Sequence, residues 1–405
     1  MDTREQLSLR VQVAKLGEAE PATARLRSGR AGGAQVRILF VCATGGSGRQ
    51  QLGGAERFLI EMLPEFSRRA EVAAVIPNGA VSVALSGAGV HVYEAGPGRK
   101  IDLAYRAAIR DAIRDFHPDV VSAHLLSSAM HTRSLRGRDF PASRLVVTLH
   151  NSLKQYVEAS TGRHRLRMRS NLLLDRLQRV TRRHTSIAVS RYEADELSNI
   201  RFGGPVRCIP NPLPRDFGAD GQQRDMTAAR AALGLPASGR LFAYVGRMEI
   251  EKGADLLDSI AECLEPDDLL VAFGDGLVRP ASPRVMYMGR TSKPELVWPS
   301  VDAVVMPSRV EAFGRVALEA VASGTPVVHT GVGGLQELLA PAEGVLAYTT
   351  SLDPVQLARK LTTSGLRNHA QESARNALAK RYAERYGFSK KVDEWYEVFA
   401  SLVGQ

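Results

Sequence analysis

The sequence predicts an α/β protein with two domains, each built on its own parallel sheet. Three observations lead to this prediction. The chain has 405 residues, which is enough for two or three domains with separate cores. Short apolar runs alternate with helical patterns in both halves, as is typical of βαβ units. A proline-rich segment, 209–214, separates the halves, so we expect two Rossmann-like sheets that face each other across a cleft.

The first half, residues 36–211, contains six apolar runs that read as strands. In chain order they are Val36–Ala43, Val72–Ile76, Val90–Tyr93, Asp119–His124, Leu145–Leu149 and Ser186–Val189. A helix should follow the first strand, because apolar residues recur on one face of residues 55–63. Residues 1–35 mix basic and acidic side chains without an apolar signal region, so we expect a loosely ordered leader there.

The second half, residues 212–375, repeats the alternation. Its expected strands are Leu241–Val245, Leu269–Phe273, Val285–Met288, Ala303–Met306 and Pro326–His329. Three prolines between residues 210 and 214 stop both a helix and a central strand, which places the domain boundary after Asn211. The final segment, residues 376–405, has one apolar face that includes Trp395 and Phe399, and an amphipathic helix is expected.

Composition argues against a membrane-spanning protein and against a protein held together by disulfides. The apolar fraction of 44% is ordinary for a globular protein, and no apolar run approaches the roughly 18 residues that span a bilayer. The three cysteines, Cys42, Cys208 and Cys263, are odd in number and far apart, which argues against disulfides and against a cysteine metal site. We therefore expect a cytoplasmic protein.

The net charge of +10 is concentrated in residues 163–184, which contain eight arginines and one acid, Asp175. Four apolar residues recur there at helical spacing, with arginines on the other faces; they are Leu166, Leu173, Leu177 and Val180. A basic amphipathic helix can lie on the inner face of an anionic membrane or hold an acidic acceptor. A solvated outer helix is the simpler interpretation. Nucleic acid is not expected, because no aromatic residue interleaves the arginines.

The stretch from Glu311 to Glu319 is the most informative part of the chain. An apolar run, 301–306, precedes it, and Gly314 opens a helical pattern, so one carboxylate lies at the mouth of a helix. The second lies about two turns inside, roughly 12 Å along the axis. The N-terminus of a helix favours a diphosphate, and a carboxylate on either side of it can accept hydrogen bonds from hydroxyl groups. This arrangement matches a nucleotide sugar, in which sugar, diphosphate and ribose are linked in that order. Alternatively, both glutamates simply favour the first turns of an exposed helix.

A glycine-rich loop, residues 44–54, follows the first strand. Its glycines are residues 45, 46, 48, 53 and 54, and they let backbone N–H groups approach a ligand closely. The loop does not match the dinucleotide fingerprint, because Gly-x-Gly-x-x-Gly does not open directly onto the helix. A merely flexible loop is the alternative.

The segment Glu311 to Glu319 resembles the Glu-x7-Glu motif of retaining glycosyltransferases with the GT-B fold, most closely those of glycosyltransferase family 4 (group 1). Further motifs in matching order are Gly53-Gly54-Ala55-Glu56-Arg57, Ser122-Ala123-His124, Gly246-Arg247 with Glu251-Lys252-Gly253, and Gly333-Gly334-Leu335-Gln336-Glu337. The resemblance covers about residues 36–400. It implies two Rossmann-like domains and a C-terminal helix that crosses back to the first domain.

The resemblance also implies roles for individual residues. Arg247 and Lys252 would bind the donor diphosphate and neutralise it as it leaves. Glu311 would hold the sugar hydroxyls and Glu319 the ribose. His124 would contact the sugar that is transferred.

Backbone turns complete the implied donor site. The residues concerned are Gly53, Gly54, Gly274, Arg290, Ala312, Phe313 and Gly314. Gly53 and Gly54 would meet the diphosphate or the attacking acceptor, and the plane of Arg290 would stack on the base. His150, at the end of the strand 145–149, is a further candidate for lining the cleft.

The sequence departs from the family pattern at the hinge. The family usually has Pro-Asn-Gly-Val-Asp, whereas this chain has Pro-Asn-Pro-Leu-Pro, which stiffens the linker and puts the usual amount of domain closure in doubt. No Asp-x-Asp occurs in the cleft loops, so we expect catalysis without a divalent metal or other cofactor.

These observations predict a retaining transferase that moves a sugar from a nucleoside diphosphate donor, a UDP-sugar, to a hydroxyl acceptor. The acceptor would be a small molecule, a natural product or a lipid-linked compound. Two alternatives stay open. An epimerase or a sugar phosphorylase could use the same scaffold, although no carboxylates are placed for epimerisation in the first half. A non-enzymatic protein could bind the nucleotide sugar alone.

Overall fold

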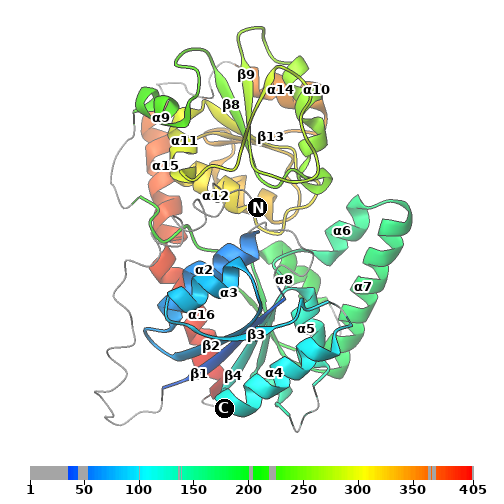
Figure 1. The fold of residues 1–405 in the computed structure, drawn as a ribbon. Helices are drawn as coiled ribbons and strands as arrows, with labels where there is room; N and C mark the ends of the chain where they lie inside the picture. The colour runs from blue at the N-terminus through cyan, green and yellow to red at the C-terminus, as the bar shows by residue number, and fades with distance from the viewer. Residues whose placement is uncertain are drawn as a thin grey trace.

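The computed structural model shows two α/β domains stacked on each other (Figure 1). The described residues are 35–43, 53–99, 101–135, 137, 139–199, 204–218, 225–363, 366 and 371–403. Residues 1–34 of the expected leader lie outside these ranges, as do Gly45, Gly46 and Gly48 of the glycine-rich loop. No helix within the described ranges is long and apolar enough to cross a membrane.

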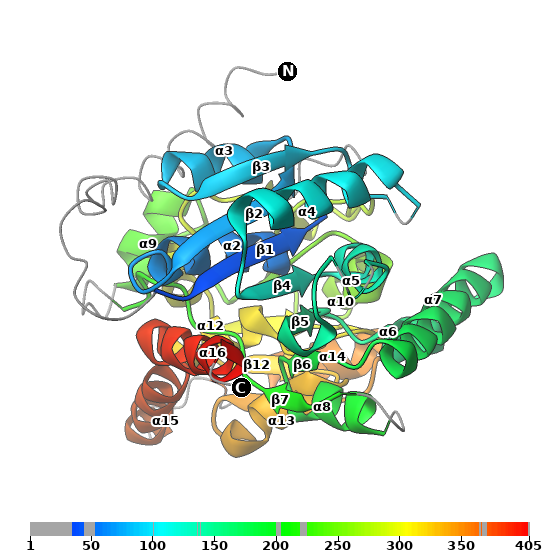
Figure 2. The ribbon, with the colours of Figure 1, turned by 90° about the horizontal axis from the view of Figure 1, so that it is seen from below.

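The first domain contains a seven-stranded parallel sheet in the order β3-β2-β1-β4-β5-β6-β7 (Figure 2). Its strands are β1 (Arg37–Cys42), β2 (Glu71–Pro77), β3 (His91–Ala95), β4 (Val120–His124), β5 (Leu145–Thr148), β6 (Thr185–Ala188) and β7 (Val206–Cys208). The first six match the predicted strands. The edge strand β7 was not predicted, because three residues with two exposed side chains form no apolar run.

Helices cover both faces of this sheet. They are α2 (Gly54–Phe66), α3 (Ala80–Gly87), α4 (Leu103–Phe116), α5 (Leu126–Arg133), α6 (Leu153–Ala159), α7 (Gly162–Thr181) and α8 (Arg191–Ser198). The apolar faces of α2 and α3 pack on one side, and those of α4 and α5 on the other. The helix predicted after the first strand is α2, whose inner face is fully buried.

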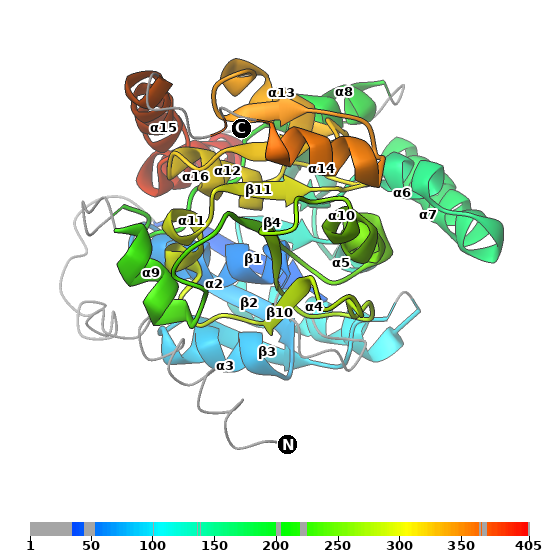
Figure 3. The same ribbon diagram turned by 90° about the horizontal axis from the view of Figure 1, so that it is seen from above.

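The second domain repeats the arrangement with a six-stranded parallel sheet in the order β10-β9-β8-β11-β12-β13 (Figure 3). Its strands are β8 (Leu241–Val245), β9 (Leu269–Phe273), β10 (Val285–Gly289), β11 (Ala303–Met306), β12 (Val327–His329) and β13 (Ala347–Thr349). Its helices are α9 (Met226–Leu233), α10 (Leu257–Glu262), α11 (Val297–Ser300), α12 (Arg315–Ala322), α13 (Gly334–Leu339) and α14 (Pro354–Thr362). Only the short edge strand β13 was missed.

The last two helices link the domains. Helix α15 (Glu372–Arg385) lies on the second domain, where Tyr382 and Tyr386 join its core. Helix α16 (Phe388–Val403) returns to the first domain and buries Trp395, whose ring centroid lies 4.8 Å from that of Phe58. This crossing confirms the predicted C-terminal helix, but the return begins at Phe388 and not at residue 376.

The linker and the returning segment cross between the domains side by side. Ile209 belongs to the core of the first domain, and Leu213 to that of the second. The Leu213 N–H donates to the Tyr386 carbonyl at 2.9 Å. The chain therefore passes between the domains twice at one place.

Candidate functional site

The site is built where loops at the carboxyl ends of both sheets meet. The segment between β11 and α12 contains Glu311, and the loop after β8 contains Arg247 and Lys252. The first domain contributes α6 and the N-terminus of α2. Contacts across the domain boundary bring these segments together.

The N-terminus of α12 depends on Gly314. Its φ of 101° is in the left-handed region, and a Cβ there would lie 2.8 Å from Leu335. The helix starts at Arg315, as the pattern predicted. Glu319 is its fifth residue, so it lies about one turn inside the helix rather than two, because residues 311–314 are not helical.

Lys252 and Glu311 form an ion pair at the mouth of this helix. The Lys252 Nζ lies 2.6 Å from Glu311 Oε2 and donates to the Val310 carbonyl at 3.1 Å. Lys252 is the last residue of a 3-10 turn, η3 (Ile250–Lys252). The next residue, Gly253, has a left-handed backbone conformation and lies directly against the loop after β11. The cation is therefore held beside the carboxylate by backbone as well as by charge.

Arg247 lies at the same edge and has partners from both domains. Its guanidinium forms an ion pair with Glu249 and interacts electrostatically with the Tyr156 hydroxyl of α6. Burial disfavours the cation, but Tyr156 and Glu249 outweigh burial, so the pKa of Arg247 is raised. Arg247 thus stays charged and keeps 37% of its side chain exposed for a ligand.

Helix α6 of the first domain reaches over this edge. The Gln155 Oε1 accepts a hydrogen bond from the Glu311 N–H at 2.8 Å, and Gln155 is only 4% exposed. Its Nε2 has no hydrogen-bond partner within the described part of the chain and lies against Gly333, where a Cβ would come within 1.7 Å of it. An amide donor is therefore buried beside Glu311 without an acceptor.

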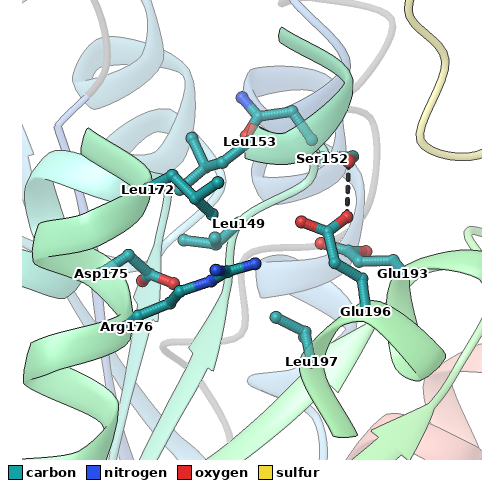
Figure 4. Close-up of a pocket in the computed structure, with 10 residues that line it drawn as sticks. Leu149, Ser152, Leu153, Leu172, Asp175, Arg176, Glu193, Glu196 and Leu197 are labelled. Atoms are coloured by element: carbon teal, nitrogen blue, oxygen red, sulfur yellow. Dashed lines mark hydrogen bonds between the residues drawn. The ribbon is translucent and has the colours of Figure 1, made fainter. Parts of the chain in front are cut away.

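The position of α6 is fixed at its first turn. The Ser152 Oγ caps the helix by accepting from the Gln155 N–H at 3.1 Å. The same hydroxyl donates to Glu196 of α8 at 2.6 Å, at the border of a small pocket between α7 and α8 (Figure 4). This contact holds the helix that supplies Gln155 and Tyr156.

Arg315 connects α12 with the first domain. Its guanidinium lies 2.9 Å from the Glu61 carboxylate of α2 and donates to the Gly54 carbonyl at 3.2 Å. Glu319 is buried beside it, and burial raises the pKa of that carboxyl although Arg315 and Arg57 oppose the shift. The two domains are thus in contact through charged groups directly behind the mouth of α12.

The two candidate histidines differ in exposure. His124 is fully buried, stacked near Trp395, and its ring nitrogens pair with Ser122 at 3.0 Å and His150 at 2.8 Å. His150 is partly exposed and has a left-handed φ of 61°. Burial and the charge of Arg315 lower the pKa of His150 to about 3, so its ring is neutral at neutral pH.

This geometry corrects the prediction that His124 contacts the sugar, and it favours His150 instead. Since His124 has no exposed surface, it cannot contact a sugar in this structure, whereas His150 keeps part of its surface exposed after the end of β5. His124 orients His150 through their hydrogen bond. The sequence could not distinguish the two, because the aromatic rings that cover His124 come from α2 and α16.

Two family profiles match the chain. The profile of Glycosyltransferase Family 4 matches residues 52–217, and that of Glycosyl transferases group 1 matches residues 239–364. The chain belongs to the family 4, group 1 glycosyltransferases.

Curated relatives match over part of their length. D-inositol 3-phosphate glycosyltransferase from Corynebacterium urealyticum is 34% identical over 204 residues, which cover 45% of this chain and 48% of that protein. The protein of the same name from Mycobacterium leprae is 42% identical over 161 residues, 35% of this chain and 37% of that protein. The match therefore spans about half or less of these relatives.

Solved structures share the whole fold. Sucrose-phosphate synthase from Thermosynechococcus elongatus superposes with a TM-score of 0.72 at 19% identity, covering 91% of this chain and 99% of the other. Anabaena Alr3699/HepE, solved with UDP and glucose, gives 0.72 at 22% identity, covering 90% and 100%. These likenesses confirm the predicted GT-B fold of this family 4 glycosyltransferase.

Within the family 4 site, two predicted donor glycines are engaged by the protein itself. The Gly274 N–H donates to the Gly289 carbonyl at 2.7 Å, and a Cβ at Gly274 would lie 1.7 Å from the Gly246 carbonyl. Gly274 is therefore required by the packing of two strands. At Gly53, the carboxylate of Glu56 folds back onto the first turn of α2.

The remaining predicted donor contacts stay predictions. Ala312 and Phe313 are buried beside the mouth of α12, and Arg290 is exposed after β10. Sequence reasoning missed Gln155 and Tyr156. Neither belongs to a recognisable motif, and only the fold brings α6 to the second domain.

Proposed function

We propose that this protein transfers a sugar, with retention of anomeric configuration, from a nucleoside diphosphate sugar to a hydroxyl acceptor. The observation that carries the proposal is the Lys252–Glu311 pair at the N-terminus of α12, with Arg247 at the same edge. We propose a UDP-sugar as donor. Support comes from Alr3699/HepE, a protein of the same fold that was solved with UDP-glucose.

The donor would extend along the cleft between these groups. Arg247 and Lys252 would bind the diphosphate with the N–H groups at Phe313 and Gly314, where the helix dipole also favours negative charge. Glu311 would accept hydrogen bonds from the sugar, and Glu319 from the ribose. His150 would border the sugar on the side of the first domain.

The proposed reaction proceeds on one face of the sugar. The bond from the anomeric carbon to the phosphate oxygen breaks, and the acceptor oxygen forms the new bond from the same side. The leaving phosphate takes the acceptor proton. Arg247 and Lys252 would stabilise the charge that builds on this phosphate, so the proposed mechanism assigns no step to a metal.

The proposed acceptor is a compound with a free hydroxyl group. Two relatives are D-inositol 3-phosphate glycosyltransferases, so D-inositol 3-phosphate is the first hydroxyl acceptor to test. Natural products and lipid-linked alcohols belong in the same panel.

The decisive experiment combines donor selection with stereochemistry. Purified protein is incubated with UDP-, ADP- and GDP-sugars, with and without acceptors, and nucleotide release is measured. We expect slow hydrolysis of one UDP-sugar, faster release with the correct acceptor, and an α-linked product by NMR from an α-linked donor. An inverted product would refute retention. Calorimetric donor binding without any turnover would identify a non-enzymatic binding protein instead.

A further inference from the structure

The outward face of α7 is apolar and basic. Leu166, Leu173, Leu177 and Val180 are 70%, 59%, 55% and 46% exposed, respectively. The buried residues of this helix are polar: Asn171, Asp175 and Arg179. The apolar stripe predicted from the sequence therefore exists, but it faces away from the protein, which is the reverse of an ordinary surface helix.

A buried polar cluster fixes this orientation. Asp175 accepts from Arg133 at 2.6 Å and from Arg179 at 2.8 Å, and all three side chains are nearly fully buried. Arg179 also donates to the Ser186 hydroxyl at 2.6 Å, and Arg133 contacts His184 at 3.2 Å. Turning the leucines inward would break these charge-assisted bonds inside the protein, which is strongly unfavourable.

Basic side chains flank the apolar stripe. At 100° per residue, Arg165 and Arg169 lie on one side of Leu166 and Leu173, and Arg163 lies on the other, all exposed. Asp175, the single acid of α7, points inward, so the outward face has no acid. Arg176 differs, because it extends over the pocket between α7 and α8 (Figure 4).

The shape of the molecule leaves this face accessible. Helix α7 stands out from the body of the first domain in all three views of the ribbon (Figures 1–3). Within the first domain it packs against α6 and α5. A flat surface can therefore meet α7 without meeting the second domain first.

We propose that the outward face of α7 docks on an anionic phospholipid bilayer, a contact that goes beyond the proposed function. The leucines enter the boundary between headgroups and acyl chains, and the arginines meet lipid phosphates. A second copy of the chain is a poorer partner, because two such faces would bring their arginines together. A nucleic acid is also a poorer partner, because its phosphates would bind the arginines but would leave the leucines exposed to water.

The test is co-sedimentation of the full chain with vesicles. Vesicles of phosphatidylcholine with about one third phosphatidylglycerol should bind the protein, and vesicles of phosphatidylcholine alone should bind it far less. Binding to the anionic vesicles should weaken between about 0.1 M and 1 M salt, because the screening length falls from roughly 10 Å to 3 Å. Absence of binding to anionic vesicles at the lower salt would overturn the proposal.

Matched variants separate membrane docking from other contacts. Leu173→Ser with Leu177→Ser should weaken vesicle binding by about tenfold or more, since the apolar insertion is lost. Arg165→Gln with Arg169→Gln should weaken it by about thirtyfold. Val83→Ser, at an exposed apolar residue of α3, is the control and should bind as the parent does.

Two outcomes would replace the bilayer by another partner. If the arginine changes abolish binding and the leucine changes do not, α7 binds polyanions by charge alone and the proposal fails. If ultracentrifugation without lipid shows a dimer that the leucine changes dissociate, the face is an interface between copies. Circular dichroism should show that all variants fold, because every changed side chain is exposed.

Discussion

At the scale of single residues, the two cations of the candidate site are paired with carboxylates of the same domain. Lys252 pairs with Glu311, and Arg247 pairs with Glu249. In the proposed function, a donor diphosphate would therefore replace these carboxylates beside the same cations. The residues that exchange partners should show the largest kinetic effects.

Arg247→Ala should lower kcat/KM by roughly two to three powers of ten, as loss of one charge-stabilising donor commonly does. The fold should persist, because Arg247 is not part of either core. Steady-state kinetics and thermal unfolding check both expectations. Arg359→Ala, on the exposed side of α14, is the matched control and should leave turnover intact. Unchanged turnover in folded Arg247→Ala would remove Arg247 from the mechanism.

Glu311→Gln and Glu319→Gln should give different kinetic signatures. Glu311 would face a sugar that gains positive charge in the transition state, so its change should chiefly reduce kcat. Ribose contacts are equal in ground and transition states, so Glu319→Gln should mainly raise the donor KM. Kinetics with saturating acceptor and varied donor test the contrast. The opposite pattern would reverse the order of sugar and ribose along α12.

The residues with a recognisable motif were predictable, and those placed by packing were not. Lys252 and Glu311 lie together because a motif at a strand end defines the place of each, and Arg247 follows β8 in the same loop as Lys252; the roles of all three stay predictions. The burial of His124 depends on Trp395, which is 271 positions away in the chain. No local pattern could have indicated that contact.

At the scale of elements, α6 connects the first domain with the second through the hydrogen bond from the Glu311 N–H to Gln155. Gln155→Ala should raise the donor KM about tenfold, because one hydrogen bond to the Glu311 backbone and one buried amide near the proposed sugar position are lost. Lys154→Ala, one position earlier and exposed, is the control. Equal kinetics for both variants would show that α6 only covers the cleft.

The cluster beneath α7 should make the first domain sensitive to acid. Burial, and next the charge of Arg133, lower the pKa of His184 to about 3, from 6.5 when unfolded. The neutral ring is favoured in the folded state, so its contribution is present above pH 6.5 and is lost as the pH falls toward 3. At pH 5 the loss is about 2 kcal/mol of unfolding free energy.

Urea unfolding at pH 7.5 and pH 5 measures this loss. Going from pH 7.5 to pH 5, His184→Gln should lose about 2 kcal/mol less than the parent, since glutamine does not titrate. His164→Gln, at an exposed histidine of α7, should follow the parent. Identical pH dependence in all three proteins would show that His184 is not buried as described.

Elements with a long apolar run were predictable, whereas short edge strands and the orientation of α7 were not. β7 and β13 have three residues each, too few for a periodic signal. The leucine spacing of α7 indicated a stripe correctly. Its direction depends on Asp175 pairing with Arg133 from α5, a contact between distant segments.

At the scale of the whole molecule, the two domains share one returning helix. Trp395→Ala should cost about 3–5 kcal/mol, because it leaves a cavity among Phe58, His124 and Phe399. The loss of stability should fall on the first domain, so the sheet of the second domain should stay protected from hydrogen exchange to a higher concentration of denaturant. Hydrogen exchange resolved by peptide measures this difference. Uniform weakening of both sheets would indicate one cooperative unit.

Helix α16 also affects the order in which the two domains can fold during translation. A ribosome releases the first domain before the second, and domains usually fold in that order. Here the first sheet lacks part of one face until residues 388–403 have emerged, because α16 fills that face with Val392, Trp395 and Phe399. The second domain, translated later, has its core residues up to Tyr386 by then. The domain translated first should therefore be the last to complete its core, and it would depend on protection by chaperones while it waits.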